Sequence, residues 1–295
     1  MTSQTNQNVL SNISSVGVVG CGLMGSGIAE VCARAGLEVV VAESSREALD
    51  AGHKRLVQSL DRAMTRGKLS EADRDATVDR IVMADDHAAF ERSDLIIEAV
   101  NEDEERKVGI FRSLDAVASD SAILASNTSS IPIMKLAMAT SRPEQVIGMH
   151  FFNPVPVLPL LEVVTSLLTG PKTTETAVSF GEDVLGKRVI RSQDRAGFIV
   201  NALLIPYLLS AIRMLESGFA TAEDIDVGMV EGCAHPMGPL ALTDLIGLDT
   251  TMAVAESLYE EFKEQLYAPP PLLNRMVDAG LLGRKAGRGF YDYAA

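Results

Sequence analysis

Two residues twelve positions apart, His150 and Glu162, have the side-chain types that move a proton near neutral pH. An unperturbed histidine has a pKa of roughly 6.5, so its ring can accept a proton and return it. A carboxylate that reaches the second ring nitrogen fixes the tautomer and stabilises the imidazolium. The pattern therefore predicts a general acid–base pair. The alternative is a core histidine and a separate surface glutamate.

The segment between these two residues predicts two strands joined by a stiff connection. Residues 146–150 form an apolar run that ends at His150, and residues 160–164 form a second run around Glu162. The prolines between the runs are Pro154, Pro156 and Pro159. Because proline fixes φ and lacks an N–H donor, we expect an extended turn. Such a pair of strands can place the carboxylate beside the ring.

A glycine-rich segment near the N-terminus predicts a dinucleotide site. The pattern G-x-G-x-x-G lies between a β-branched run at residues 13–19 and an apolar helix expected at residues 28–35. Gly20 permits the tight turn, Gly22 lets a pyrophosphate approach, and Gly25 lets helix and strand pack closely. The N–H groups and dipole of the helix N-terminus then attract phosphate. The alternative is a glycine-rich turn in an α/β protein that binds no cofactor.

The next expected strand, at residues 37–42, ends at Glu43. In dinucleotide-binding domains an acid at about this offset binds the adenosine ribose. A carboxylate accepts a hydrogen bond from a free 2′-hydroxyl group and repels a 2′-phosphate. The predicted cofactor is therefore NAD rather than NADP.

The composition favours a soluble enzyme of the cytoplasm and excludes other classes of protein. The chain has 295 residues, of which 40 are acidic and 26 are basic. This balance opposes binding to nucleic acid or to anionic membranes. Cys21, Cys32 and Cys233 are too few and too scattered for a disulfide framework or a zinc site, so we expect no metal. Residues 1–12 lack the features of a signal peptide and are expected to form a flexible tail.

Between the glycine-rich segment and His150 the pattern alternates between helix and strand. We expect helices at 46–66, 70–79, 104–118 and after Pro132, and strands at 81–83, 94–98 and 122–125. Repeated β–α units imply a parallel sheet, with ligands beyond the carboxyl ends of its strands. The glycine-rich turn, the acidic loop at 98–102, the polar segment at 126–130 and His150 should therefore meet at one edge.

After residue 190 the pattern changes to helices alone. They are expected at residues 198–216, 221–231, 239–246, 249–262 and 271–279. Thr221 is a good N-cap, with Asp224 in the first turn that follows. The predicted fold class is therefore α/β. A Rossmann-type doubly wound sheet is expected over residues 13–190, followed by a smaller all-α domain over residues 191–295.

Six segments taken together are more specific than any one of them. They are residues 16–25 (VGVVGCGLMG), 125–130 (ASNTSS), 150–156 (HFFNPVP), 197–201 (GFIVN), 236–239 (PMGP) and 283–291 (GRKAGRGFY). Their residues and order resemble the L-3-hydroxyacyl-CoA dehydrogenase family, and most of all its stand-alone short-chain 3-hydroxybutyryl-CoA dehydrogenases. The resemblance implies hydride transfer between NAD and C3 of an acyl-CoA substrate, in fatty-acid or butanoate metabolism. It also implies a homodimer formed mainly through the helical domain.

The resemblance implies catalytic roles for four residues. His150 matches the acid/base that takes the 3-hydroxyl proton during oxidation, and Glu162 matches the carboxylate that orients it. Ser129 matches the hydroxyl group that hydrogen-bonds the substrate oxygen at C3, and Asn201 matches the amide that polarises this oxygen. Such partners lower the barrier to hydride removal. Ser129 could instead only cap the next helix, and Asn201 could be a cap or a solvent contact.

The resemblance also implies positions that bind NAD and CoA. For NAD they are Gly20, Gly22, Leu23, Met24, Gly25, Glu43, Glu102, Lys107, Asn127 and Ser129. For CoA they are Ser59, Arg66 and Lys68. Arg55, Arg62 and Arg66 share one face of the long helix, which suits the CoA phosphates. The alternatives are a solvated basic face and, for Lys107, a solvated helix residue.

Two other functions account for part of the pattern. Nicotinamide-dependent dehydrogenases of free 3-hydroxy acids use a lysine in place of the His–Glu pair. A non-catalytic dinucleotide-binding relative would keep the fold with an altered site. The presence of all four catalytic matches favours the acyl-CoA dehydrogenase over both. Two positions depart from the family, since Glu43 replaces its usual aspartate and Ala202 its usual arginine.

Overall fold

The computed structural model describes residues 13–293 and divides into two compact units, the first ending at Arg195 and the second beginning at Ala196. The expected tail at residues 1–12 lies outside the described residues. No helix in the described part of the chain is long and apolar enough to cross a membrane.

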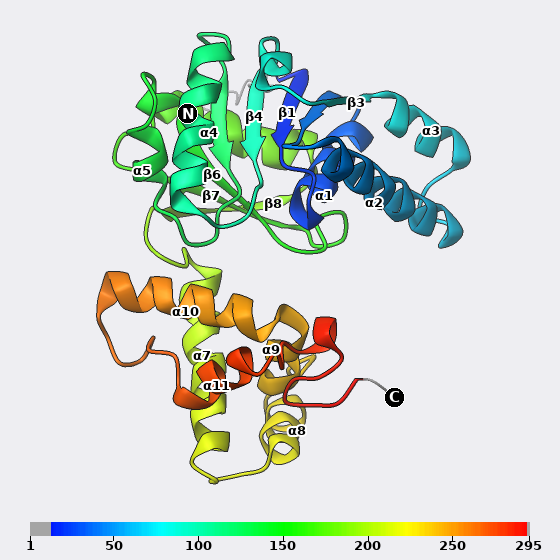
Figure 1. The fold of residues 1–295 in the computed structure, drawn as a ribbon. Helices are drawn as coiled ribbons and strands as arrows, with labels where there is room; N and C mark the ends of the chain where they lie inside the picture. Colours follow the sequence, from blue (N-terminus) through cyan, green and yellow to red (C-terminus); the bar gives the residue numbers. More distant parts are fainter. Residues whose placement is uncertain (1–12, 294–295) are drawn as a thin grey trace, which may run out of the picture. The chain divides into compact units, whose positions relative to one another are not determined.

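From residue 13 onward the first unit consists of eight strands and the helices between them (Figure 1). The strands are β1 (Ser15–Val19), β2 (Glu38–Ala42), β3 (Ile81–Ala84), β4 (Leu95–Glu98), β5 (Ile123–Ser126), β6 (Val146–Phe151), β7 (Leu160–Thr165) and β8 (Arg188–Gln193). The helices are α1 (Leu23–Arg34), α2 (Arg46–Thr65), α3 (Glu71–Asp79), α4 (Glu104–Val117), α5 (Ile133–Ala137) and α6 (Pro171–Ser179). Short helical turns are η1 (His87–Phe90), η2 (Pro143–Gln145) and η3 (Phe180–Val184).

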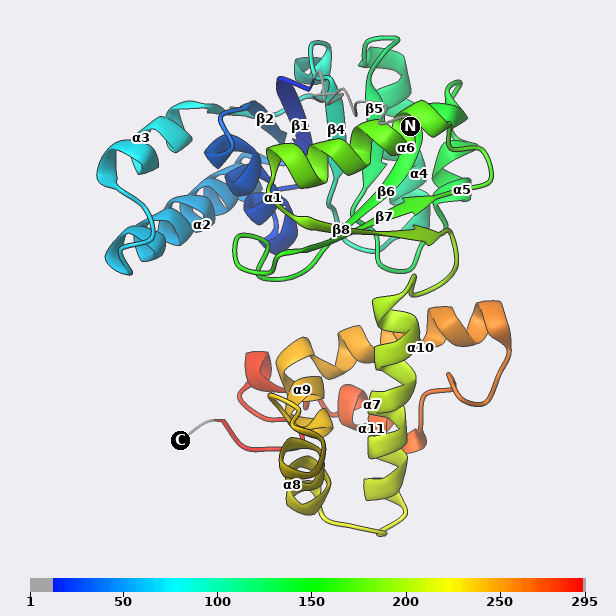
Figure 2. The same cartoon turned by 180° about the vertical axis from the view of Figure 1, so that it is seen from behind.

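The eight strands form one sheet in the order β3-β2-β1-β4-β5-β6-β7-β8. Strands β1 to β6 are parallel, whereas β7 runs antiparallel to β6 and β8 runs parallel to β7. Helices α4 and α5 cover one face (Figure 1), and α1 and α6 cover the other (Figure 2). Every residue of β4, β5 and β6 is buried, as expected for strands covered on both faces. The predicted doubly wound α/β sheet is confirmed.

Strand β8 and helix α6 were not expected from the sequence. β8 pairs with β7 along its whole length, so the sheet continues beyond residue 190 and the expected domain boundary falls inside a strand. The β8 sequence, Arg-Val-Ile-Arg-Ser-Gln, has only two apolar residues, and three of its six residues are exposed at the edge of the sheet. Arginine and other polar side chains on an edge strand oppose pairing with another chain. The same polar residues explain why β8 cannot be found by searching the sequence for apolar runs.

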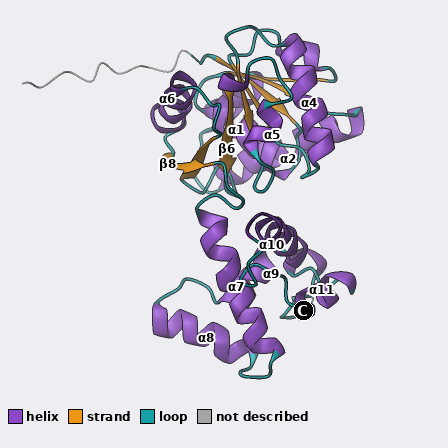
Figure 3. Cartoon of the chain, turned by 90° about the vertical axis from the view of Figure 1, so that its left-hand side faces the viewer, coloured by secondary structure: helices purple, strands orange, loops and turns teal. Residues whose placement is uncertain are grey.

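Over residues 196–293 the second unit contains five α-helices and a short turn (Figure 3). They are α7 (Val200–Glu216), α8 (Ala222–Cys233), α9 (Pro239–Ile246), α10 (Leu248–Phe262), α11 (Pro271–Asp278) and η4 (Arg284–Ala286). All the helices expected after residue 190 are present, and Thr221 caps α8 by accepting the Asp224 N–H. Helix α9 occupies the range that the sequence predicts.

Two buried aspartates, Asp226 and Asp244, accept hydrogen bonds from residues in or next to the segments 236–239 and 283–291. Asp226 accepts hydrogen bonds from Leu240 N, Ala241 N and Tyr291 Oη. Asp244 accepts hydrogen bonds from Phe290 N, Tyr291 N and Tyr293 Oη. A Cβ atom at Gly238 would overlap Asp226, and one at Gly289 would overlap Asp244. The glycines are therefore required by the close approach of these carboxylates.

Candidate active site

Strands β6 and β7 place His150 directly opposite Glu162 in their antiparallel register. His150 Nδ1 lies 2.7 Å from Glu162 Oε2, Glu162 is fully buried and His150 is 6% exposed. The expected proximity is confirmed, and the alternative of a surface glutamate is wrong. A neutral ring that donates its Nδ1 proton to the carboxylate presents Nε2 as a proton acceptor. The pair can therefore perform general acid–base chemistry.

The connection between β6 and β7 is a closed turn rather than the expected extended one. The Asn153–Pro154 peptide is cis. The N–H groups of Val157 and Leu158 both donate to the Pro154 carbonyl oxygen, each at 2.9 Å. Val155 is buried, while Val157 is exposed. The turn therefore packs its Val155 side chain into the interior of the first unit and leaves Val157 at the surface.

The polar segment after β5 is organised by Glu102. Glu102 Oε1 accepts hydrogen bonds from Thr128 Oγ1 at 2.8 Å, Ser129 N at 2.6 Å and Ser129 Oγ at 3.0 Å. Asn127 Oδ1 accepts the Phe151 N–H at 2.9 Å and ties the segment to the end of β6. The first two N–H groups of α5, at Ile133 and Met134, donate to the Asp194 carboxylate, so Ser129 does not cap the next helix.

Lys107 is buried, with 1% of its surface exposed, so the alternative of a solvated helix residue is wrong. Its Nζ atom lies 2.7 Å from Glu102 Oε2 and 3.1 Å from Glu98 Oε1. Burial alone would raise the pKa of the Glu102 carboxyl group, but the Lys107 ammonium and the donors from Thr128 and Ser129 outweigh it and lower that pKa. Glu102 is therefore held as an anion beside Ser129.

The glycine-rich turn has the geometry that a dinucleotide needs. Gly20 has φ of +91°, a conformation that side chains rarely adopt. A Cβ atom at Gly25 would lie 1.8 Å from the Gly20 carbonyl oxygen, so only glycine allows this approach. Space around Gly22 is open to 4 Å. Leu23 and Met24 begin helix α1 directly beyond it.

Glu43 lies at the end of β2 and contacts the glycine-rich turn. Its Oε1 atom accepts the Cys21 N–H at 2.7 Å, and its Oε2 atom accepts the Ser44 N–H at 3.0 Å. Burial is the main reason that the pKa of the Cys21 thiol is raised to about 11, with Glu43 adding to it. The thiol is therefore neutral, and Cys21 fills space in the turn rather than acting as a nucleophile.

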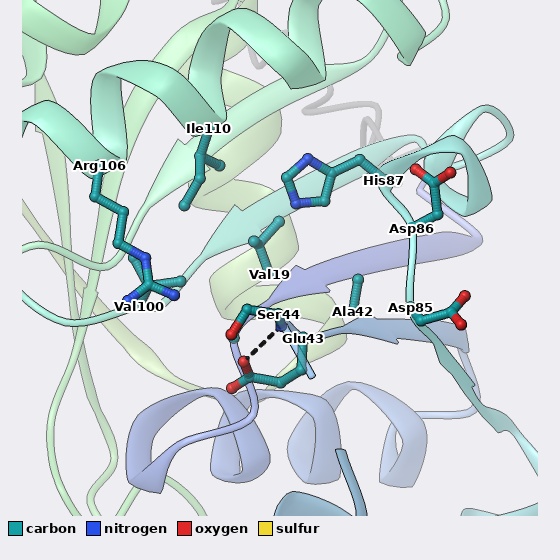
Figure 4. Close-up of a pocket in the computed structure, with 11 residues that line it drawn as sticks. Val19, Ala42, Glu43, Ser44, Asp85, Asp86, His87, Val100, Arg106 and Ile110 are labelled. Atoms are coloured by element: carbon teal, nitrogen blue, oxygen red, sulfur yellow. Dashed lines mark hydrogen bonds between the residues drawn. The ribbon is translucent and has the colours of Figure 1, made fainter. Parts of the chain in front are cut away.

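A cavity of about 340 Å³ opens beside Glu43, beyond the carboxyl ends of β1 and β2. Figure 4 shows Arg106 and Ile110 reaching it from α4, His87 from η1, and Glu43 and Ser44 from the end of β2. Burial lowers the pKa of the His87 imidazole, whose Nδ1 atom contacts Ser113 Oγ at 2.9 Å. The glycine cradle, the carboxylate and this cavity fit the adenosine half of NAD.

Apart from Gly20 and Glu43, the residues that line this cavity were not predicted as site residues from the sequence. The four-residue spacing of Arg106 and Ile110 puts them on one face of α4, and this was the available signal. His87 gave no signal, because it lies in the short turn η1 rather than at the end of a strand.

The residues expected at the CoA site have different environments. Arg66 and Lys68 are exposed at the end of α2, whereas Ser59 is half-buried. Arg55 does not belong to an open basic face, because its Nη1 atom donates to the Cys21 carbonyl oxygen at 2.7 Å.

Asn201 belongs to the second unit, where it is half-buried in the first turn of α7. Within residues 13–293 no group of three or more His, Cys, Asp or Glu residues could hold a metal ion.

Known proteins resemble this chain over nearly its full length. Residues 15–195 match the 3-hydroxyacyl-CoA dehydrogenase NAD binding domain, and residues 197–293 match the 3-hydroxyacyl-CoA dehydrogenase C-terminal domain. A 3-hydroxybutyryl-CoA dehydrogenase of Mycobacterium tuberculosis (strain H37Rv) is 57% identical over 282 residues, covering 95% of this chain and 99% of the relative. The human mitochondrial hydroxyacyl-coenzyme A dehydrogenase is 41% identical over 289 residues, covering 95% and 91%.

Solved structures agree with these matches. The crystal structure of M. tuberculosis FadB2 superposes with a TM-score of 0.94 at 57% identity, covering 95% of this chain and 99% of that one. The (S)-3-hydroxybutyryl-CoA dehydrogenase PaaH1 of Ralstonia eutropha gives a TM-score of 0.92 at 45% identity, covering 96% and 100%. Because both domain matches and these relatives span the glycine-rich turn, the His–Glu pair and the helical unit, the chain belongs to the 3-hydroxyacyl-CoA dehydrogenase family.

Proposed function

We propose that this enzyme interconverts (S)-3-hydroxybutyryl-CoA and acetoacetyl-CoA with NAD as the hydride carrier. The observation that carries the proposal is the buried 2.7 Å hydrogen bond between His150 and Glu162, at the edge of the sheet that carries the glycine-rich turn. The relatives at 57% and 45% identity that are named for 3-hydroxybutyryl-CoA support the short acyl chain.

The chain's own residues would move the proton. Bound NAD supplies the hydride acceptor for oxidation. His150 Nε2 accepts the 3-hydroxyl proton, while Glu162 keeps the ring oriented and stabilises the imidazolium. In the reverse direction the same nitrogen returns the proton to the C3 oxygen. The histidine therefore needs to be neutral for oxidation and charged for reduction.

Ser129 and Asn201 are proposed to hold the C3 oxygen. Ser129 Oγ donates its hydrogen to Glu102 Oε1 at 3.0 Å in this structure, and it would turn this hydrogen toward the C3 oxygen of a bound substrate, whose own hydroxyl proton goes to His150. The Asn201 amide would donate to the same oxygen as it becomes a carbonyl. Leu23, Met24, Glu102, Lys107 and Asn127 remain proposed NAD contacts on the family pattern.

The exposed basic residues at the end of α2 are proposed to hold CoA. The chain carries a net charge of −14, so an anionic substrate needs a local basic surface. Arg66 and Lys68 are exposed there, and Ser59 lies on the same helix. We place the enzyme in the cytoplasm, which agrees with the free thiols of Cys21, Cys32 and Cys233.

Activity on free and CoA-linked substrates separates this proposal from its alternatives. We expect NADH formation from (S)-3-hydroxybutyryl-CoA, and activity at least about a hundredfold lower on free 3-hydroxybutyrate, because remote CoA contacts contribute to transition-state binding. Absorbance of NADH measures both reactions. Equal activity on the free acid would favour a free-acid dehydrogenase, and no turnover of either would favour a non-catalytic relative.

Removing the acid–base pair should slow chemistry without removing the cofactor. We expect His150→Gln to lower kcat by ~10²–10⁴-fold, the usual contribution of general acid–base catalysis. Glu162→Gln should also lower kcat and move the acidic limb of the oxidation profile to lower pH, because the imidazolium loses its anionic partner. NADH titration should stay near wild type, since the glycine-rich turn holds the cofactor. Near-normal turnover in His150→Gln would overturn the mechanism.

Replacing Glu43 should weaken the preference for NAD over NADP. Glu43→Ser removes a carboxylate that would repel a 2′-phosphate, so the ratio of kcat/KM values should fall by at least about tenfold, or ~1.4 kcal/mol. Glu43→Asp is the matched control, because it keeps the charge and should keep the preference. An unchanged ratio in Glu43→Ser would place the cofactor discrimination elsewhere.

The helical unit is proposed to form a homodimer. It exposes apolar side chains that a monomer would leave in water. They are Ile199, Leu203, Phe219, Val227 and Val230. Light scattering should give twice the 31.5 kDa mass of one chain. Leu203→Glu, at a side chain that is 72% exposed, should shift the mass toward a monomer, whereas Val82→Glu in the first unit should not. A monomeric wild type at micromolar concentration would contradict the proposal.

A further inference from the structure

A buried lysine holds the turn that joins the two strands of the acid–base pair. Lys187 lies one residue before β8, and its Nζ atom donates to the carbonyl oxygens of Val155 and Leu158, at 2.6 Å each. Both carbonyl groups belong to the turn at residues 154–159, between β6 and β7. A single ammonium group therefore fixes two points of this turn.

The environment of Lys187 is unusual for a lysine. The residue is only 9% exposed, and among residues 13–293 no carboxylate forms an ion pair with it. Burial lowers the pKa of its ammonium group. The neighbouring Cys32 provides no counter-charge, because burial raises the pKa of its thiol to about 12. Lysines are almost never buried without a partner, so the two carbonyl contacts must offset this cost.

The same turn is held on its other side by helix α1. Val155 is buried, and a Cβ atom at Gly27 would lie 2.9 Å from Val155 Cβ, so the turn packs where α1 has no side chain. The Arg188 N–H also donates to the Pro159 carbonyl oxygen at 2.7 Å. The turn is therefore fixed between the helix that follows the glycine-rich turn and the start of β8.

The position of this turn bears directly on the acid–base pair. In the β6–β7 register, Phe151 and Leu161 form the last pair before the turn, directly beside the pair His150 and Glu162. A shift of the turn would therefore reach the histidine along a short stretch of both strands. Catalysis is sensitive to such shifts, since a misplacement of about 1 Å can cost ~10²-fold in rate.

We propose that Lys187 is a positioning residue of the active site, which aligns His150 with Glu162 by anchoring the turn between their strands. The inference rests on the proposed function of that pair. It differs from a purely structural role, because it links Lys187 to the alignment of one hydrogen bond and not only to the stability of the fold.

Lys187→Met tests the proposal, since methionine has a similar length but no donor. We expect kcat for 3-hydroxybutyryl-CoA oxidation to fall by about 10–100-fold, while NADH binding stays near wild type. The acidic limb of the pH–rate profile should move to lower pH, as expected for Glu162→Gln, because a misaligned Glu162 stabilises the imidazolium less, whereas loss of the Lys187 charge alone would move the limb to higher pH. Lys172→Met, at an exposed lysine of α6, is the matched control and should leave both quantities unchanged.

A second measurement tests Lys187 without substrate. The ring carbon–proton NMR signal of His150, assigned by its loss in His150→Gln, should titrate at lower pH in Lys187→Met than in wild type. A lower melting temperature with unchanged kcat and unchanged His150 titration would overturn the proposal. If Lys187→Met does not fold, Lys187→Gln, whose shorter amide cannot span both carbonyl oxygens, replaces it with the same expected changes. If the wild-type protein is inactive on 3-hydroxybutyryl-CoA but the His150 titration still differs between wild type and Lys187→Met, the proposed function is rejected and the role of Lys187 is kept.

Discussion

The reversal of chain direction between β6 and β7 is the constraint on which the candidate active site depends. Parallel strands deliver their side chains to one edge at their carboxyl ends, and β6 brings His150 there in this way. The carboxylate opposite that histidine comes from β7, which begins near these carboxyl ends because it runs antiparallel to β6. A slip of one residue would turn Glu162 to the other face of the sheet. Register here is a chemical requirement as well as a structural one.

Two buried lysines of the first unit, Lys107 and Lys187, have different kinds of partner. Lys107 is paired with Glu98 and Glu102, so its charge is neutralised and it fixes an anion beside Ser129. Lys187 is held by backbone carbonyl groups and keeps an uncompensated charge in the interior. Breaking a buried pair such as that of Lys107 leaves a charge without a partner, which is costly. Both lysines organise backbone segments that carry the side chains of the site.

Most of the fold could be predicted from the sequence, because buried parallel strands are continuous apolar runs and the second unit has clear helix signals, namely the Thr221 cap of α8 and the prolines that begin α9 and α11. The His150–Glu162 contact followed from local spacing, since both residues belong to one hairpin. β8 escaped prediction because its pairing with β7 outweighs a polar sequence. The burial of Lys187 escaped for a similar reason. Its partners are backbone carbonyl oxygens 29 and 32 residues away, and backbone atoms leave no mark in a side-chain pattern.

The hydrogen bond from Cys21 N to Glu43 Oε1 couples the proposed choice of cofactor to the conformation of the glycine-rich turn. The carboxylate that is proposed to discriminate between cofactors also holds the glycine-rich turn, which is proposed to bind the pyrophosphate. A redesign toward a phosphorylated cofactor that replaces Glu43 would thus remove the acceptor of the Cys21 N–H in the glycine-rich turn. Such a redesign needs a neutral replacement that still accepts this amide hydrogen, together with a new cation. A change of cofactor preference in this enzyme therefore has to restore an acceptor for the Cys21 N–H as well as change the charge at position 43.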